Sequence, residues 1–197
     1  MEEHQRLSIM SPHQDFHTQR LLQFSIDVLE QALALVAWHE TPGAPDYAEP
    51  VGAHLRHVIE HYEALLSPAE PGRVDYDHRP RDRELERQPA VARARLEALQ
   101  ARLRQWTDAQ LDAPLQMRGL GGLAGGYDFA VASSAGRELA FMASHTIHHY
   151  ALLRAHCQQH GISINAEFGR APATVAHARA ALAAAPRPSP KETPCNA

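Results

Sequence analysis

Apolar residues recur at three- and four-residue steps in five segments of the chain, and polar residues occupy the positions between them. This spacing places the apolar side chains on one face of an α-helix and predicts amphipathic helices. Residues typical of helix ends follow three of the segments: Thr41-Pro42-Gly43, Ser67-Pro68 and Gly161. The predicted helices span residues 16–39, 51–66, 89–106, 135–160 and 174–185.

Two long connections separate these helices. Residues 70–88 are strongly charged and contain several prolines, and residues 111–134 contain five glycines. Segments of this composition are typical of loops, so we expect loops here, the second with a short extended piece at 127–131. The glycines do not follow the order of a phosphate-binding loop, which argues against nucleotide binding.

Four long helices and a shorter last one favour one architecture. We predict an all-α fold, a four-helix bundle with an additional short C-terminal helix and long inter-helix loops. A chain of 197 residues is long enough for one compact core. We expect a flexible lead-in at residues 1–15, the helical bundle domain at 16–185, and a disordered tail at 186–197, where four prolines occur.

Composition and charge exclude several classes of protein. The net charge is −4, with no long run of Lys or Arg, so nucleic acid is not expected as a partner. The longest apolar stretch, residues 28–38, contains Glu30 and Gln31 and predicts no membrane span. The acidic N-terminus does not resemble a secretory signal, and two cysteines make no disulfide framework. We therefore expect a cytoplasmic protein.

Histidine is unusually abundant in this sequence. The chain has 14 His against 5 Phe, 5 Tyr and 2 Trp, and eight of the histidines lie in the windows 54–61 and 145–160. His145 and His149 are one helical turn apart, on the same stripe as Met142, so two imidazoles face the core together. Buried imidazoles need a partner, which is either a metal ion or another hydrogen-bonding group.

The predicted helix 51–66 carries a second group: His54, His57 and His61. All three flank its apolar stripe, and the helical spacing places His54 and His61 nearer the core than His57. The spacing alone does not choose among them. A third imidazole from this helix would complete a three-His site with an open coordination position, which is typical of catalytic metal centres. The alternative interpretation is a set of buried histidines that bond to one another.

The remaining polar residues of interest have simpler interpretations. His156 and His160 lie near the end of a helix and indicate a structural role. His39 and His78 are expected to be exposed. Glu60 and Glu138 could act as acid or base, but carboxylates at such positions are more typical of ion pairs and of support for metal ligands.

Two sequence segments resemble the DinB-like superfamily of metal-binding four-helix-bundle proteins. They are Val51-Gly52-Ala53-His54-Leu55-Arg56-His57-Val58, followed by His61, and His145-Thr146-Ile147-His148-His149-Tyr150. The resemblance extends over residues 16–185. Val74-Asp75-Tyr76-Asp77 and Phe168-Gly169-Arg170-Ala171-Pro172 resemble an uncharacterised branch of that superfamily.

The resemblance implies a set of metal ligands. In that superfamily a His before an aliphatic residue on the second helix binds a divalent ion together with both His of the later pair. Carried over by motif, the ligands are His57, which precedes Val58, with His145 and His149. His61 is the first substitute for His57, and His54 is a further one.

The resemblance also implies a class of function. The superfamily includes metal-dependent thiol transferases and a thiol-using isomerase, so we expect a divalent-metal-dependent transferase, isomerase or hydrolase. The implied cofactor is a divalent ion such as Zn, Ni or Fe, and the implied partner is a small-molecule substrate, with thiols as candidates. The alternative is a non-catalytic metal-binding or stress-response interaction protein, with a homodimer as the expected assembly.

Overall fold

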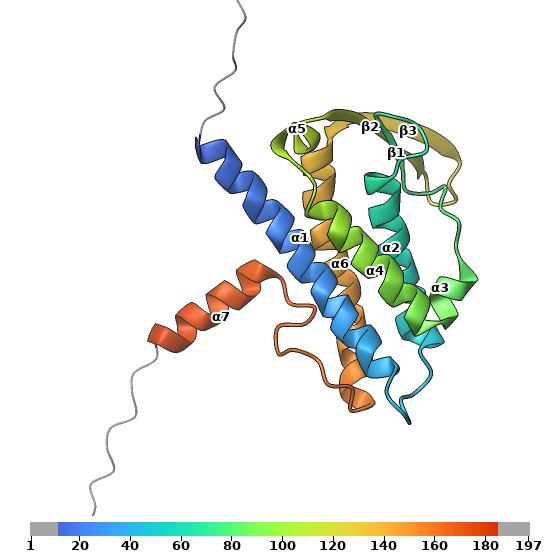
Figure 1. Cartoon of the computed structure of the whole chain (residues 1–197), viewed down its shortest axis with the longest axis vertical. Coiled ribbons are helices and arrows are strands. Elements are labelled where there is room, and N and C mark those ends of the chain that lie inside the picture. Colours follow the sequence, from blue (N-terminus) through green and yellow to red (C-terminus); the bar gives the residue numbers. More distant parts are fainter. Residues whose placement is uncertain (1–11, 185–197) are drawn as a thin grey trace, which may run out of the picture.

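The computed structural model describes residues 12–184, which form a mostly helical fold with a small sheet (Figure 1). Four long helices make up most of the structure: α1 (Pro12–His39), α2 (Ala53–Leu66), α4 (Pro89–Leu103) and α6 (Ala135–Gln159). Helix α1 packs against α4 and α6, and α2 packs against the same two helices. The short helical elements are η1 (Ala48–Gly52), α3 (Arg83–Arg87), α5 (Asp108–Leu111) and α7 (Pro172–Ala184).

The apolar faces of the long helices supply the core. Leu29 of α1, Leu55 of α2, Leu96 of α4 and Leu139 of α6 are fully buried in one cluster. Tyr150 of α6 is buried as well, and its hydroxyl donates to the carbonyl oxygen of Val28 over 3.0 Å. That bond satisfies the one polar atom that the tyrosine carries into the core.

Local signals set the ends of these helices. Ser134 caps α6 and accepts a hydrogen bond from the backbone N–H of Arg137, and Pro89 begins α4. Gly161 follows α6 with a φ of +64°, a conformation that glycine adopts at little cost. The predicted stop at this glycine is therefore confirmed.

The prediction that residues 111–134 form a loop is wrong, apart from the extended piece expected at 127–131, which lies within a strand. They contain α5 and two antiparallel strands, β2 (Pro114–Gly121) and β3 (Tyr127–Ser134). A third strand, β1 (Arg73–Asp75), pairs in parallel with β2, and the sheet lies across one end of the long helices (Figure 1). The fold is accordingly mostly helical but not all-α.

Glycines made these strands look like a loop in the sequence. Gly119 and Gly121 of β2 pair with Phe129 and Tyr127 of β3. A Cβ atom would lie 2.9 Å from the ring of Phe129 at position 119 and 2.3 Å from the ring of Tyr127 at position 121. The aromatic rings of β3 lie over these glycines and leave no room for a larger side chain. Strand β2 therefore requires glycine at these positions, although glycine in a sequence normally argues against a strand.

The charged segment 70–88 is also more ordered than predicted. It contains β1 and the short helix α3, whose first turn is capped by the side chain of Asp82 through the backbone N–H of Glu84. Leu85 of α3 is fully buried and joins the core. The cap forms the short helix, and the buried leucine together with ion pairs such as Arg56 with Glu86 holds this charged stretch on the long helices.

Several boundaries differ from the predicted ones. Helix α1 begins at Pro12, α4 ends at Leu103, and α7 spans Pro172–Ala184. Helix α7 has no buried residue and projects from the other helices (Figure 1). Most of the predicted lead-in, residues 1–11, and the predicted tail lie outside the described residues, so the division into domains stays a prediction.

Among residues 12–184, one helix has the length and composition to cross a membrane. Within residues His17–His39 of α1, an 18-residue window has a mean hydropathy of 1.4. In the structure the apolar residues Leu29, Ala32 and Val36 of this helix are fully buried against the other helices. A core helix passes the same test of length and composition, so the expected absence of a membrane partner stays a prediction.

The expectation that His39 is exposed is wrong. Its side chain is buried at the end of α1, where Nδ1 donates to the carbonyl oxygen of Pro45 over 3.2 Å and the ring contacts Trp38 and Tyr47. The loop after α1 folds back over the ring, a tertiary contact that helical spacing does not reveal. His78 is exposed, as predicted.

Candidate metal centre

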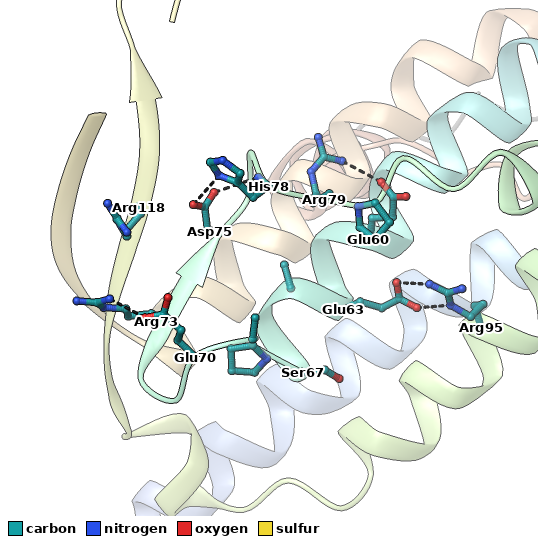
Figure 2. A pocket seen from close by; sticks show the side chains of 14 residues that line it. Glu60, Glu63, Ser67, Glu70, Arg73, Asp75, His78, Arg79, Arg95 and Arg118 are labelled. Atoms are coloured by element: carbon teal, nitrogen blue, oxygen red, sulfur yellow. Dashed lines mark hydrogen bonds and ion pairs between the residues drawn. The ribbon is translucent and has the colours of Figure 1, made fainter. Parts of the chain in front are cut away.

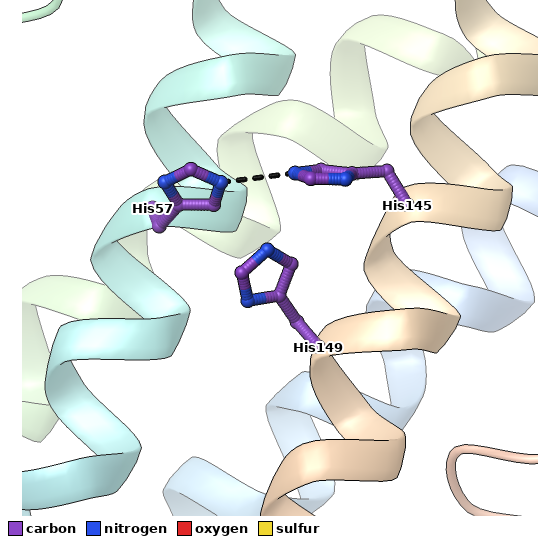
Figure 3. Close-up of side chains that lie close together, drawn as sticks. All are labelled: His57, His145 and His149. Atoms are coloured by element: carbon purple, nitrogen blue, oxygen red, sulfur yellow. Dashed lines mark hydrogen bonds between the residues drawn. The ribbon is translucent and has the colours of Figure 1, made fainter. Parts of the chain in front are cut away.

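The three predicted ligands lie together between α2 and α6. His57 comes from α2, and His145 and His149 come from successive turns of α6 (Figure 3). One nitrogen from each ring lies within 4.8 Å of the other two, and all three side chains are half-buried. Three imidazoles in this arrangement could hold one metal ion. The structure places the residues together, and their role as ligands stays a prediction.

Direct contacts connect the imidazoles. Nε2 of His57 lies 2.9 Å from Nε2 of His145 (Figure 3). The centre of the His149 ring lies 4.4 Å from the centre of the His57 ring and 4.6 Å from that of the His145 ring. Two nitrogens at hydrogen-bonding distance mean that one donates and the other accepts. Part of the alternative interpretation, histidines that bond to one another, therefore describes these residues when no ion is bound.

The two substitutes, His54 and His61, adjoin the same cluster. Nδ1 of His54 lies 2.8 Å from Nδ1 of His149. The centres of the His61 and His57 rings are 4.0 Å apart. His61 is buried, as its position on the helix predicts, and its Nδ1 donates to the carbonyl oxygen of His57 over 2.6 Å. That bond leaves Nε2 of the neutral ring with a lone pair. Five imidazoles thus form one continuous group.

Burial keeps these imidazoles unprotonated. Burial, reinforced by the charges of neighbouring histidines and Arg79, lowers the pKa of His57 from 6.5 to about 2. Burial lowers the pKa of His61 and of His149 to about 4, and it lowers the pKa of His54 and His145 as well. A metal ion binds neutral imidazole, so the cluster is in the protonation state that binding requires at neutral pH.

Aromatic rings flank the cluster. Tyr76 stacks on His61 with 5.4 Å between ring centres, and Phe141 stacks on His145 with 5.6 Å. The tyrosine hydroxyl donates to Glu138, a fully buried carboxylate that also accepts from Ser133. These contacts fix the rings from the side of the sheet. Glu138 bonds with Tyr76, Ser133 and Arg137, which lie outside the imidazole cluster, so it supports the site from a distance.

Arg79 is the residue that sequence reasoning missed. It lies in the charged segment before α3, where its Nε donates to the carbonyl oxygen of Tyr76 and its Nη1 lies 3.3 Å from Nδ1 of His57. Nη1 also lies 3.5 Å from Oε2 of Glu60. The sequence marks this segment only as a long charged connection, and alternating charges do not show which arginine turns inward.

A cavity of about 780 Å³ shares Glu60 and Arg79 with the site (Figure 2). It lies beside α2 and β1, and Arg95 and Arg118 also contribute to its lining. Most of its charged side chains are paired with each other, as Figure 2 shows for Glu63 with Arg95. The arginine therefore contacts His57 and also lines the cavity.

The remaining histidine pair lies elsewhere. The rings of His156 and His160, at the end of α6, are 4.3 Å apart, and neither residue is part of the three-His group. This is consistent with the structural role predicted for them.

Known proteins resemble this chain in two ways. The sequence profile of the DinB superfamily matches residues 25–153, more than half of the chain. FK506-binding protein 5 of Rhizopus delemar is 33% identical over 104 residues, which are 53% of this chain and 27% of that protein. The chain thus spans about a quarter of the length of this relative. No solved structure gives a significant match.

Proposed function

The chain belongs to the DinB superfamily, and from this premise we propose that it is a divalent-metal-dependent enzyme whose ligands are His57, His145 and His149. The packing of α1, α2, α4 and α6 supports a DinB-like four-helix bundle, with α7 as the additional C-terminal helix. In such a bundle, side chains on facing helices build the metal site.

One observation carries the proposal. The three donor nitrogens lie within 4.8 Å of one another, and the group contains imidazoles alone, without a thiol or carboxylate. Three neutral imidazoles fill three positions of a four-coordinate ion and leave one position open, as catalytic sites do. When bound, an ion there would lower the pKa of a coordinated water or thiol and supply a nucleophile at neutral pH.

The chain's own residues suit Zn, Ni or Fe, because imidazole binds all three and geometry rather than affinity selects among them. Phe141 stacks on one side of His145 and is partly exposed. The guanidinium of Arg137 lies over the ring of Phe141, 5.6 Å from the ring centre. We infer that a small substrate, with thiols as the first class to examine, approaches over this apolar and cationic edge.

A second candidate function is favoured by His54. Its Nδ1 is 2.8 Å from Nδ1 of His149, so it could supply a fourth imidazole and close the site. A closed site is structural, and the protein would then act through a partner. Tyr127, Phe129 and Val131 of β3 are exposed and offer an apolar surface for such a partner, a second copy of the chain included.

The first experiment is metal analysis of tag-free protein by mass spectrometry. We expect close to one ion per chain in the wild type and loss of that ion in His57→Ala, His145→Ala and His149→Ala. The matched control is His148→Ala, which changes an exposed neighbour outside the three-His group. A wild type that stays metal-free after incubation with Zn and Ni would overturn the proposal.

A second measurement separates the two candidate functions. For an enzyme, the thermal midpoint should change little when a chelator removes the ion, because the core is made by apolar contacts. For a structural site, chelation should unfold the protein.

A further inference from the structure

Arg79 lies between a predicted metal ligand and a buried carboxylate. Its Nη1 is 3.3 Å from Nδ1 of His57 and 3.5 Å from Oε2 of Glu60, the contact drawn in Figure 2. The arginine side chain is 11% exposed, and its Nε is held by the carbonyl oxygen of Tyr76. One guanidinium nitrogen therefore faces both groups at once.

This contact fixes the proton of His57. A guanidinium only donates hydrogen bonds, so Nδ1 of His57 must accept one. The single proton of the neutral ring is then on Nε2, which donates to Nε2 of His145 over 2.9 Å. In this arrangement, the nitrogen of His57 that faces the other imidazoles carries a proton instead of a free lone pair.

Coordination through Nε2 requires the opposite form of the ring. Nε2 must lose its proton, and Nδ1 must carry one and donate it to an acceptor. With Arg79 in place, two hydrogen-bond donors, the guanidinium and the N–H at Nδ1 of His57, would face each other across 3.3 Å. The ring therefore needs a different partner for Nδ1 when it binds an ion.

Glu60 is suited to be that partner. It lies three residues after His57 on α2, so the two side chains emerge as neighbours on the helix surface. Its side chain is fully buried, and Oε1 accepts from the backbone N–H of Asp82 over 2.7 Å. Among residues 12–184, no group donates a hydrogen bond to Oε2. Oε2 has the longer ion-pair contact with Nη1 of Arg79 at 3.5 Å, which leaves it able to accept a hydrogen bond, an uncommon state for a buried carboxylate oxygen.

We propose that Glu60 and Arg79 are positioning residues that set the metal affinity of the three-His site through the proton of His57. With Arg79 on Nδ1, the ring is held in the form protonated at Nε2. With Glu60 as acceptor, the ring is held in the form protonated at Nδ1, and Nε2 is free to coordinate. The ring stays neutral throughout, because solvent takes the proton from Nε2 and returns one to Nδ1. This inference rests on the proposed metal binding.

Substitutions separate the two roles. Glu60→Gln keeps the shape but weakens the acceptor, so we expect zinc affinity to fall by about tenfold or more. Arg79→Met removes both the opposing donor and a positive charge, so we expect affinity to rise. The controls are Glu63→Gln and Arg95→Met, which make the same charge changes at a neighbouring ion pair that does not include His57. Circular dichroism establishes that each variant is folded.

Two measurements test the proposal. Zinc affinity is measured by competition with a chromophoric chelator at fixed pH and salt. The proton is located by long-range ¹H–¹⁵N correlation on protein labelled at histidine nitrogens, with His57 assigned from the His57→Ala spectrum. We expect Nε2–H in metal-free wild type and Nδ1–H after zinc is added.

The outcomes are distinct. The proposal is overturned if Glu60→Gln and Glu63→Gln have equal affinity, if Arg79→Met binds more weakly than Arg95→Met, or if metal-free His57 carries its proton on Nδ1. A wild type that binds no zinc contradicts the proposed function instead. In that case the metal-free proteins still test the role of the arginine. We expect the proton of His57 to shift away from Nε2 in Arg79→Met.

Discussion

His57 and His145 are 88 positions apart in the sequence, and their Nε2 atoms lie 2.9 Å apart in the structure. One residue is on α2 and the other on α6, two helices that pack against each other. Leu55 and Leu139, which lie close to these histidines in the sequence of their helices, are fully buried. The apolar core thus sets the spacing of the imidazoles, and no loop has to hold the ligands.

An open metal site makes a prediction for His54. If the site has three imidazole ligands and an open position, His54→Ala should keep one ion per chain, and its zinc affinity should differ from wild type by less than about tenfold, because only a neighbour of His149 is lost. Metal content and chelator competition measure both quantities. A variant that loses its ion would identify His54 as a fourth ligand and favour the structural site.

The pH dependence of stability follows from the lowered pKa values. Unfolded histidine titrates near 6.5, whereas in the fold the pKa of His57 is about 2 and that of His61 and of His149 is about 4. Between these values the unfolded state binds protons that the folded state does not. The free energy of unfolding of metal-free protein should therefore fall as the pH falls from about 6.5 towards 4, and the cluster should have no such effect above that range.

Urea denaturation at pH 7, 6 and 5 in the presence of a chelator checks this expectation. His57→Gln should lose stability less steeply with falling pH than wild type, because it lacks one of the protons in question. His177→Gln, which changes an exposed histidine of α7, should follow the wild type. Stability that is constant or rises between pH 7 and pH 5 would contradict the prediction.

Helical periodicity predicted the long helices because each buries an apolar stripe, as Leu29 and Leu96 show. The same reasoning placed His61 in the interior. It did not choose His57, which came from the resemblance to the superfamily. Of the strands, only the extended piece at 127–131 within β3 was predicted, and the role of Arg79 was not. Strand pairing at Gly119 and the inward turn of Arg79 depend on partners distant in the sequence, and neither has a local pattern that reveals them.

Tyr76 supports the fold through Glu138. Its hydroxyl donates to Oε2 of that fully buried carboxylate over 2.9 Å. A hydrogen bond to a charged group contributes about 1.5–3 kcal/mol, so Tyr76→Phe should lower the free energy of unfolding by about that amount. The ring that stacks on His61 is kept, so metal content should stay unchanged.

Chemical denaturation and metal analysis of the same samples test both halves of this prediction. The matched control is Tyr127→Phe, which removes a hydroxyl from an exposed tyrosine of β3 and should change stability by less than about 0.5 kcal/mol. Equal effects at positions 76 and 127 would show that the bond to Glu138 contributes nothing measurable.

Gly52, the N-cap residue of α2, lies against the backbone of α3. Its backbone N–H donates to Tyr47 over 2.6 Å, and a Cβ atom at this position would lie 1.9 Å from the carbonyl oxygen of Glu86. Backbone atoms cannot rotate away as a side chain can, so Gly52→Ala must push α3 off the first turn of α2. Overpacking of this kind costs about 1–3 kcal/mol, and we expect at least that loss in the free energy of unfolding.

Gly126→Ala is the control for this substitution. Gly126 lies between β2 and β3, its φ is not in the left-handed region, and a Cβ atom there would meet nothing within 4 Å. Its stability should stay within about 0.5 kcal/mol of wild type. The first five residues of α2 include His54 and His57, so Gly52→Ala should also weaken zinc binding where Gly126→Ala does not. Unchanged stability in Gly52→Ala would contradict the prediction and would mean that α3 can move away from the start of α2 without cost.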